Sequence, residues 1–558
     1  MFAFTILTLP FLVLPLWYLI SLFSNYRLAR TSKLPILISP VNPFNPFWIL
    51  LRPYTNPVLS YLPFGLGRST DYNYLGFAWK DKNRLHKRYG GAYIIVTPGQ
   101  NQLIVGDATA CNDIFKNHRI WPKNDAFNVP LNTFGPNVGT SEGDAWQRQR
   151  KITAVAFNER NNSLVWQEAV KQSRQMLATW VLKPESVGVT TTMDDFFLFA
   201  LHVLTGAGFG RSYDYDSPLK KPDPGHSMSY REALRGVLGN IFITYAIAKA
   251  GSLSFLLPAS GKRVQRAIAE FKLYMRELVD QERASYSQGK GTNAANLMST
   301  LVRASESEAR IANEKLRNSL TDEEFVGNLY IFNLAGHDTT AGTLTYAIGL
   351  LACFPEWQDW IKEELREVFG DGDVQENEYE AAFPRLRRCM AIMYETLRLY
   401  APLNGVPRCT GTEPKNLKLG SETYTIPKDT LVFVNNAAVQ CDQQHWGDDS
   451  LLWRPGRWLK QDAEDKAAEV PVQPKENVYI PWISGPRVCP GKKFSQVEHT
   501  AAIACLFHKH RVAPVLEAGE SVLQARMRLL CALQDSDMAL AMRMNHPERL
   551  TLRWGKDV

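Results

Sequence analysis

Apolar residues recur at helical spacing through most of this chain, and strand-like stretches are short. Apolar positions three and four residues apart predict amphipathic helices, whereas alternation with period two predicts strands. On this pattern, helices are predicted at residues 76–89, 145–157, 163–182, 193–210, 228–249, 261–287, 321–353, 355–369, 384–400 and 491–509. Strands are predicted at residues 92–105, 420–434 and 540–555. The pattern therefore predicts a mainly α fold with small β-sheets.

The predicted helix 321–353 has both of its ends marked in the sequence. Thr321 and Glu324 form a capping box at its start, and a proline two residues after its end stops it. Within it, a run from Ala335 to Thr340 places glycine, aspartate and two threonines, which favour helix poorly, in an apolar stretch. Such conflicts collect at functional sites, so this run is a candidate site. The alternative is that its polar side chains hydrogen-bond the helix's own carbonyl groups.

The N-terminus predicts a membrane anchor followed by a connector. Residues 1–23 carry no charged side chain and are long enough to span a bilayer. Basic residues begin only at Arg27, after the apolar run. By the positive-inside rule, this position predicts that the C-terminal bulk stays in the cytosol. It also disfavours the alternative, a cleaved signal peptide, which would carry its basic residues before the apolar run. Residues 24–64 are rich in proline and predict a stiff connector near the membrane surface. Residues 65–558 are then left for the main domain.

Composition narrows the class of protein further. The 558 residues are 45% hydrophobic and 21% charged, as in an ordinary globular protein with ample core. The net charge of +7 is spread along the chain, without the Lys/Arg-rich block typical of nucleic-acid binding, so no nucleic-acid partner is expected. The eight cysteines show no Cys-x-x-Cys spacing, which argues against zinc or dithiol chemistry and favours a reducing compartment.

One cysteine lies in a loop suited to a reactive thiolate. The segment Trp482-Ile-Ser-Gly485-Pro-Arg487-Val-Cys489-Pro-Gly491 precedes a predicted helix, whose dipole favours the anion over the thiol. Gly485 and Gly491 let the backbone lie close to a flat cofactor, and Arg487 offers a fork to a carboxylate. The alternative is a buried structural cysteine.

A second motif pairs opposite charges inside an apolar helix. In Glu395-Thr-Leu-Arg398 the two charged side chains share one helix face, and the apolar residues around them indicate burial. A buried pair needs further partners. A solvated surface bridge is the alternative.

In their order and spacing, these motifs resemble those of the cytochrome P450 superfamily, and most of all its fungal, endoplasmic-reticulum members. The loop around Cys489 is similar to the haem-binding pattern Phe-x-x-Gly-x-Arg-x-Cys-x-Gly, with Trp482 in place of Phe. The segment that contains Arg457 resembles Pro-Glu-Arg-Phe, with Gly456 and Trp458 in place of Glu and Phe. The resemblance implies the P450 fold, preceded here by an N-terminal transmembrane helix.

The resemblance also assigns roles to single residues. It implies that Cys489 ligates the iron of haem b, and that Glu395, Arg398 and Arg457 form a structural triad. Asp338 would relay protons and Thr339 would hydrogen-bond dioxygen. The haem propionates would be bound by four side chains: Trp146 and Arg150 of a Trp-x-x-x-Arg motif, Arg408 after the Glu395 helix, and Arg487.

The function implied by the resemblance is a haem-thiolate monooxygenase, single-pass in the endoplasmic-reticulum membrane with a cytosolic catalytic domain. NADPH electrons would pass through a separate flavoprotein reductase, because the chain carries no Gly-rich nucleotide-binding loop of its own. One oxygen atom would enter a lipophilic secondary metabolite or xenobiotic. Two alternatives stay open, a haem-thiolate isomerase or dehydratase that uses no dioxygen and a non-enzymatic haem sensor. The Asp338-Thr339 pair favours the monooxygenase.

A lipophilic substrate is expected because the segments that the resemblance assigns to selectivity are apolar. They contribute Phe127, Val129, Leu131, Phe134, Ile331, Phe332, Leu334, Leu403 and Val406.

Overall fold

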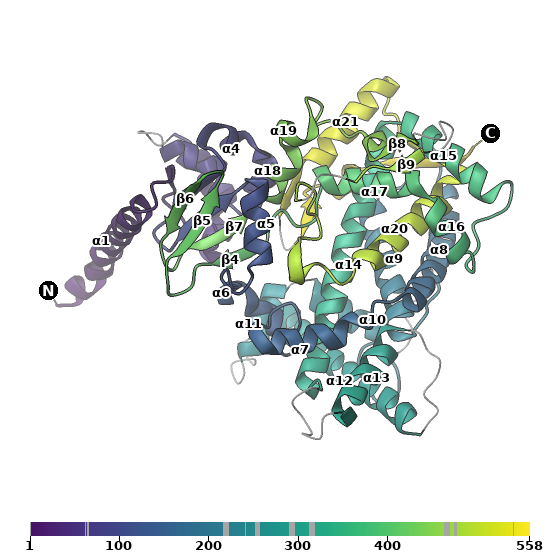
Figure 1. Ribbon diagram of the computed structural model, residues 1–558, viewed down its shortest axis with the longest axis horizontal. Helices are drawn as coiled ribbons and strands as arrows, with labels where there is room; N and C mark the ends of the chain where they lie inside the picture. The colour runs from purple at the N-terminus through teal and green to yellow at the C-terminus, as the bar shows by residue number, and fades with distance from the viewer. Residues whose placement is uncertain are drawn as a thin grey trace.

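Helices form most of the body, and a five-stranded sheet lies beside them toward the end that carries the N-terminus (Figure 1). The architecture comes from a computed structural model of the chain. It describes residues 2–557 except residues 62, 64–65, 216–221, 240, 251–256, 289–295, 312–318, 463–468, 474–476 and 539–540. The predicted mainly α fold with small β-sheets is confirmed within these residues.

The α-helices in the described part of the chain are α1 Phe2–Arg30, α2 Pro46–Leu59, α3 Phe77–Asp81, α4 Arg84–Tyr89, α5 Ala108–Lys116, α6 Asp125–Asn128, α7 Gly143–Ala154, α8 Glu159–Val181, α9 Thr192–Phe209, α10 Tyr230–Leu238, α11 Ile241–Ala250, α12 Ala259–Ser287, α13 Leu297–Ile311, α14 Asp322–Cys353, α15 Glu356–Phe369, α16 Tyr379–Ala382, α17 Arg387–Leu399, α18 Asn436–Cys441, α19 Gln443–Trp446, α20 Lys492–Phe507 and α21 Val522–Gln534.

The main sheet has the strand order β1-β2-β3-β7-β4, formed by β1 Ile36–Ile38, β2 Ala92–Val96, β3 Asn101–Val105, β7 Leu431–Val434 and β4 Pro407–Cys409. Strands β2 and β3 form an antiparallel hairpin, and β7 runs parallel to β3. Four two-stranded sheets complete the β structure: β5 Lys415–Leu419 with β6 Glu422–Ile426, β8 Leu459–Gln461 with β9 Glu469–Pro471, β10 His510–Pro514 with β13 Leu552–Lys556, and β11 Ser536–Met538 with β12 Met542–Met544.

Most long helices lie where the apolar period predicts them, but some predicted elements are divided. The helix predicted at 76–89 is two helices, α3 and α4, because Lys82 between them has a positive φ of 56°. The helix predicted at 228–249 is also two, α10 and α11. The strand predicted at 540–555 is β12 and β13, which belong to different sheets and are separated by a short 3-10 helix that contains a proline.

Helix α14 runs through the centre of the molecule and packs against α9, α17, α20 and α21 (Figure 1). Its predicted capping box is present: Glu324 N–H donates to Thr321 Oγ1 at 3.2 Å, and Thr321 N–H donates to the Glu324 carboxylate at 3.0 Å. Arg148 of α7 also pairs with Glu324 at 2.6 Å. The start of α14 is therefore fixed to α7, the helix that carries the Trp-x-x-x-Arg motif.

The proline-rich segment predicted as a connector packs on the main body. Strand β1 pairs with β2, and α2 begins with a proline after the N-cap Asn45, where proline fits a helix. Trp48 Nε1 donates to the carbonyl of Asn73 at 2.6 Å. The predicted boundary at 64/65 lies outside the described residues.

Of the predicted anchor, residues 1–23, residues 2–23 lie within α1; Met1 and the side chains of residues 2–14 lie outside the described part of the chain. Among the described residues, no helix has both the length and the apolar character needed to cross a membrane.

Candidate active site

The loop that leads to Cys489 is folded tightly by its glycine and its backbone. Gly485 has a φ of +73°, and a Cβ atom there would lie 2.9 Å from the carbonyl oxygen of Phe115 in α5. Only glycine fits this position without displacing backbone. The Cys489 N–H donates to the carbonyl of Trp482 at 3.1 Å, which closes the loop immediately before α20. The sulfur is thereby held at the N-terminal end of α20.

Opposing effects act on the Cys489 thiol. Burial raises its pKa, while the N–H of Gly491, Arg150 and Lys492 act in the opposite direction. These groups stabilise negative charge on the sulfur, as a thiolate ligand of a metal requires. The surroundings of Cys489 are thus suited to a thiolate once a cation such as iron compensates the cost of burial.

A cluster of buried cations lies near this loop. Arg408 of β4 is fully buried, and none of its three guanidinium nitrogens has a hydrogen-bond partner among the described residues. Burial lowers the pKa of Arg408 to about 10, with Arg487 adding to the effect. Arg487 pairs with Glu142 and donates to the carbonyl of Ser141 at 3.1 Å. Because an unpartnered buried guanidinium is costly, Arg408 requires a hydrogen-bonded anion that the described part of the chain does not supply.

Lys123 and His118 belong to the same cluster, and the motifs did not reveal them. Lys123 forms a β-bridge with Arg408, and its ammonium donates to the carbonyl of Gly139. Burial lowers the pKa of Lys123 to about 7, with Arg487 and Arg408 adding to the effect and Glu142 opposing it. His118 has an unpartnered Nδ1, and burial and then Arg487 lower its pKa. In the sequence, Lys123 is simply a basic residue that follows Trp121 and Pro122, and nothing else there points to its role.

The two residues of the Trp-x-x-x-Arg motif take different positions. The Trp146 ring lies under the Arg487 guanidinium at 4.4 Å and against His118 at 4.9 Å, so it belongs to the cation cluster. Arg150 instead donates to the carbonyl of Val488 at 2.9 Å, on the cysteine side of the site. The role predicted for Arg150 at a propionate stays a prediction.

These residues fit a haem. Cys489 offers a thiolate for the iron, and the cations Lys123, Arg408 and Arg487 outnumber Glu142, the acid that acts on all three. Two carboxylates, as on haem b, would balance the excess positive charge and satisfy Arg408.

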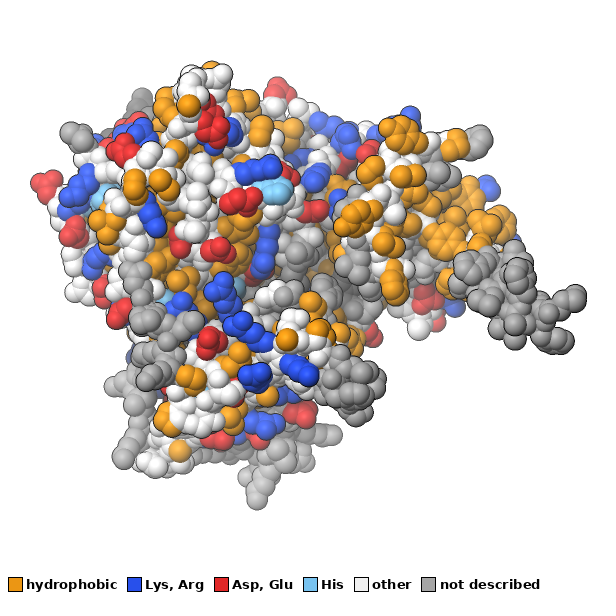
Figure 2. Space-filling model, turned by 180° about the vertical axis from the view of Figure 1, so that it is seen from behind, with side chains coloured by type: hydrophobic (Ala, Val, Ile, Leu, Met, Phe, Trp, Pro, Cys, Tyr) orange, Lys and Arg blue, Asp and Glu red, His pale blue; other side chains and the backbone are white. Residues whose placement is uncertain are grey.

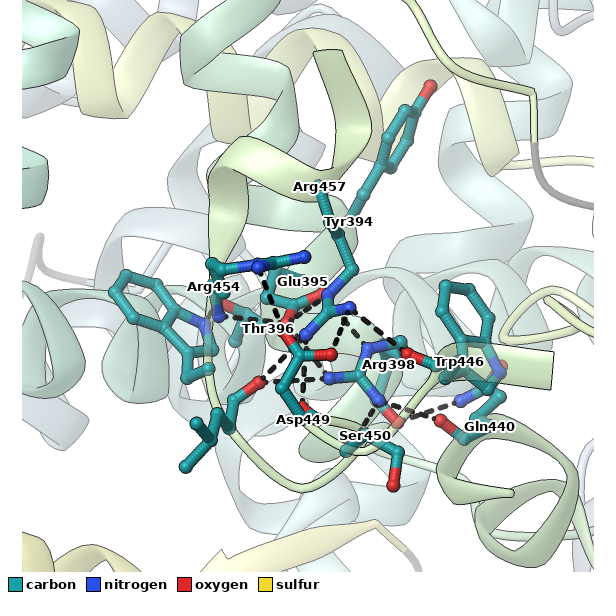
Figure 3. Close-up of polar contacts among 12 residues, drawn as sticks. Tyr394, Glu395, Thr396, Arg398, Gln440, Trp446, Asp449, Ser450, Arg454 and Arg457 are labelled. Atoms are coloured by element: carbon teal, nitrogen blue, oxygen red, sulfur yellow. Dashed lines mark hydrogen bonds and ion pairs between the residues drawn. The ribbon is translucent and has the colours of Figure 1, made fainter. Parts of the chain in front are cut away.

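Glu395 is the centre of a buried polar network on α17 (Figure 3). Its carboxylate pairs with Arg398 at 2.9 Å and with Arg457 at 2.9 Å, and the side chains of Glu395 and Arg398 are fully buried. The structure therefore brings the three predicted residues together, and the pair is not a surface bridge. Arg398 also donates to the carbonyls of Gln440 at 2.9 Å and Leu452 at 3.1 Å.

Trp458, which stands where the family pattern has phenylalanine, takes part in this network. Trp458 Nε1 donates to Glu395 at 3.0 Å, and the backbone N–H of Arg454 donates to Glu395 at 2.9 Å. The ring of Trp458 lies 4.6 Å from that of Tyr479, which is 6.1 Å from Trp482 in the cysteine loop. An aromatic cluster thus joins the network around Glu395 to the loop of Cys489.

The polar run of α14 contains two different arrangements. Thr339 Oγ1 donates to the carbonyl of Ala335 at 2.8 Å, the helix back-bond that was the alternative for this residue. Asp338 is buried and pairs with Arg543 of β12. The guanidinium of Arg543 lies over the ring of Phe197 in α9, at 4.7 Å. Arg543 follows α14 by about two hundred residues, and no motif indicated it.

The apolar residues predicted to select the substrate divide into two groups. Phe134, Phe332 and Leu334 are core residues: Phe134 packs on Tyr330 at 4.5 Å, and Phe332 packs on Phe157 at 5.4 Å. Val129 and Leu403 are 39% and 38% exposed and remain candidates. The side chain of Phe127 lies outside the described residues.

Comparison with known proteins adds to this geometry. The cytochrome P450 family model matches residues 72–531. A phomenoic acid biosynthesis cluster cytochrome P450 monooxygenase of Leptosphaeria maculans is 29% identical over 91% of this chain and 91% of its own length. A cytochrome P450 monooxygenase of Penicillium roqueforti is 29% identical over 89% of each. A crystal structure of a cytochrome P450, 17% identical, shares the fold with a TM-score of 0.62 over 86% of this chain and 98% of that one.

Proposed function

The chain belongs to the cytochrome P450 family as a monooxygenase, and we propose that it works at a membrane, on a lipophilic substrate, with NADPH electrons delivered by a separate flavoprotein reductase. The observation that carries the haem chemistry is the occurrence in one site of Cys489, in its tight loop, and of a buried Arg408 whose guanidinium has no hydrogen-bond partner among the described residues. A secondary metabolite is the favoured kind of substrate, because the Leptosphaeria relative is named for a biosynthesis cluster.

Haem ligated by a thiolate supplies the binding and reductive activation of dioxygen. The chain contributes the surroundings. Arg408, Arg487 and Lys123 would bind the two carboxylates of the haem, and Cys489 is held by the backbone of its own loop. Asp338 and Thr339 are consecutive residues of α14, and each would act separately on the proton route, Asp338 through its carboxylate and Thr339 through its hydroxyl. Arg543 pairs with the carboxylate of Asp338 and fixes its position.

The reductase would meet the chain on the cysteine side. Lys492 and Lys493 are exposed at the start of α20, next to the loop of Cys489. Lys492 Nζ lies 5.3 Å from the Trp482 ring, and Lys493 Nζ lies 4.2 Å from the Phe383 ring. Exposed ammonium groups at this place favour a partner with an acidic surface.

The proposal of membrane association rests on the outer faces of α1 and α2. Figure 2 shows apolar side chains gathered on the side of the molecule that carries these helices. The most exposed among them are Leu16, Trp17, Leu19, Ile20, Phe23, Phe47, Leu51, Tyr54, Val58 and Tyr61. The inner face of α2 is fixed by Trp48 and by the ion pair of Arg52 with Asp537 at 3.2 Å. Together with the predicted single-pass anchor, this surface fits the endoplasmic-reticulum membrane, with the catalytic domain in the cytosol.

We expect weaker membrane binding when serine replaces Phe47, Tyr54 and Val58 together. The exposed fractions of these side chains are 76%, 79% and 70%. Each fully buried apolar side chain contributes roughly 1.5–3 kcal/mol, so even partial insertion predicts a loss of at least about tenfold. The measurement is co-flotation with phosphatidylcholine vesicles that contain phosphatidylserine, using chain that starts after α1. Leu182→Ser, at an 83% exposed position after α8, is the control and should bind as the wild type does. Equal binding by the triple variant would contradict the proposed surface.

Thr339→Ala is expected to separate NADPH consumption from product formation. If the Thr339 hydroxyl guides protons, its loss leaves haem and substrate binding intact but diverts electrons and dioxygen into hydrogen peroxide. Product per NADPH should fall roughly tenfold or more, as for other lost proton-transfer groups. The measurement is this coupling ratio with reconstituted reductase and a substrate identified by metabolite profiling.

The companion variant Thr343→Ala serves as the control, because Thr343 also back-bonds to a helix carbonyl, that of Thr339, at 2.8 Å. Unchanged coupling in Thr339→Ala would remove this residue from the proton route. Product formed without dioxygen or NADPH would favour the isomerase alternative.

A further inference from the structure

A histidine in the loop before α10 is held between two carboxylates of α12. His226 Nδ1 lies 2.7 Å from Glu270 Oε2, and His226 Nε2 lies 3.0 Å from Glu277 Oε2. The ring is stacked on Tyr274 with 3.6 Å between centroids and 8° between planes. Its side chain is 1% exposed. Glu270, Tyr274 and Glu277 follow one another at spacings of four and three residues, which places them on one face of α12.

The neighbours of His226 are tied to the same helix face. Ser227 donates to Glu270 Oε1 through its N–H at 2.9 Å and through its hydroxyl at 2.7 Å. The Tyr274 hydroxyl donates to the carbonyl of Met228 at 3.0 Å. Residues 226–228 are therefore bound to α12 by side-chain hydrogen bonds. They lie immediately before the capping box of Ser229 and Glu232 that starts α10.

The two contacts of the His226 ring together require its protonated, imidazolium form. A neutral imidazole has one N–H and one lone pair, so it can donate to one carboxylate only and turns its lone pair toward the other. The imidazolium form donates to both. The 2.7 Å contact with Glu270 has the length of a charge-assisted hydrogen bond, a kind about twice as strong as a neutral one, and the 3.0 Å contact with Glu277 has an ordinary N–H···O length. We propose that His226 is a pH-sensitive latch: as an imidazolium bridging Glu270 and Glu277 it holds the start of α10 against α12, and on losing its proton it releases it.

The charges around the ring support this proposal. Burial lowers the pKa of His226, and the hydrogen bonds to Glu270 and Glu277 raise it more, so that the net shift is upward. Arg211, whose guanidinium lies 5.7 Å from the Tyr274 ring, opposes the imidazolium. It is paired with Asp223 at 3.3 Å, which offsets its charge. Because the folded-state pKa is raised, the latch is fully closed below the ordinary histidine pKa and is lost as the pH rises through the raised value.

Release of the latch affects helix α14. Tyr230, the first residue of α10, donates through its hydroxyl to Asn333 of α14 at 3.4 Å. Asn333 lies two residues before the Ala335–Thr340 run. The latch thus sets how firmly α10 is held over the part of α14 that precedes this run. It acts through α10 and α12 and does not depend on the identity of the cofactor.

Backbone hydrogen exchange of residues 222–238 in the full haem-loaded chain tests the latch. After correction for the chemical exchange rate, wild-type protection is expected to fall about tenfold between about pH 6 and pH 9, the worth of one charge-assisted hydrogen bond. In Glu277→Gln, which keeps the shape but removes one charge, the fall should begin at lower pH. In His226→Gln, protection should be low at every pH.

The control is His546→Gln, because His546 contacts a single carboxylate, Glu548, at 3.2 Å and is 48% exposed. This variant should reproduce the wild-type profile of residues 222–238. Protection that is independent of pH in the wild type, or an unchanged profile in both His226→Gln and Glu277→Gln, would overturn the latch. Because Glu277 is 41% exposed, its variant is expected to fold even if the His226 variant does not.

Discussion

Cys489→Ser abolishes the red-shifted Soret band of the ferrous carbonyl complex, because an alcohol does not provide the thiolate donation on which that band depends. The change removes one sulfur atom and leaves the loop fold in place, since the Cys489 N–H to Trp482 hydrogen bond and Gly485 are unaffected. Monooxygenase activity should fall below detection. The measurement is the carbonyl difference spectrum of purified wild type and variant, together with haem content and turnover.

Cys531→Ser is the matched control, because Cys531 is an exposed cysteine on α21. Its spectrum should equal that of the wild type. A Cys489→Ser protein that keeps the red-shifted band would show that another residue ligates the iron. The proposed function would then lose its main support.

Glu395→Ala is expected to remove roughly 3–5 kcal/mol from the free energy of unfolding, the cost of breaking a buried ion pair. Glu395 is fully buried and accepts hydrogen bonds from Arg398, Arg457, Trp458 and the backbone of Arg454. Its removal leaves two guanidinium groups without their shared anion. A loss of this size is a large part of the stability of a typical domain, so little haem-loaded protein should accumulate.

Yield and haem content of the expressed protein measure this effect, and the midpoint of urea unfolding measures it in any protein that folds. The control is Glu376→Ala, which breaks the exposed ion pair with Arg174 at 3.5 Å. Such pairs contribute about 0–1 kcal/mol, so the control should behave as the wild type. Normal stability of Glu395→Ala would mean that the surrounding carbonyls and the Asp449 carboxylate satisfy Arg398 and Arg457 without Glu395.

Sequence alone determined the long helices, because a helix that buries one face repeats its apolar residues at a period fixed by backbone geometry. Helix α14 is the clearest example, since its capping box and the following proline also marked its ends. Helix α5, with nine residues, was not predicted because few turns give too few repeats to read, and α13, with 15 residues, was also not predicted. Helix α21 was missed although Ser521 and Gln524 form a capping box at its start. That signal was available in the sequence.

Sequence also indicated the parts of the site whose chemistry is local: the cysteine loop, the Glu395-Arg398 pair and the polar run of α14. In each, the residues that act together are a few positions apart, so their spacing carries the information. The burial of the Glu395 pair could be inferred from its apolar neighbours. Its second arginine came from the resemblance to a family.

Only the tertiary structure decided which distant residues meet. Lys123 joins Arg408 through a β-bridge, Arg543 reaches Asp338 from a hairpin near the C-terminus, and His226 lies between two carboxylates of α12. Each of these contacts joins segments tens to hundreds of residues apart, and a single basic residue or histidine in a loop looks the same in sequence whether it faces water or a buried acid. Burial and the charge of the partner fix what such a group does, and both are properties of the folded chain.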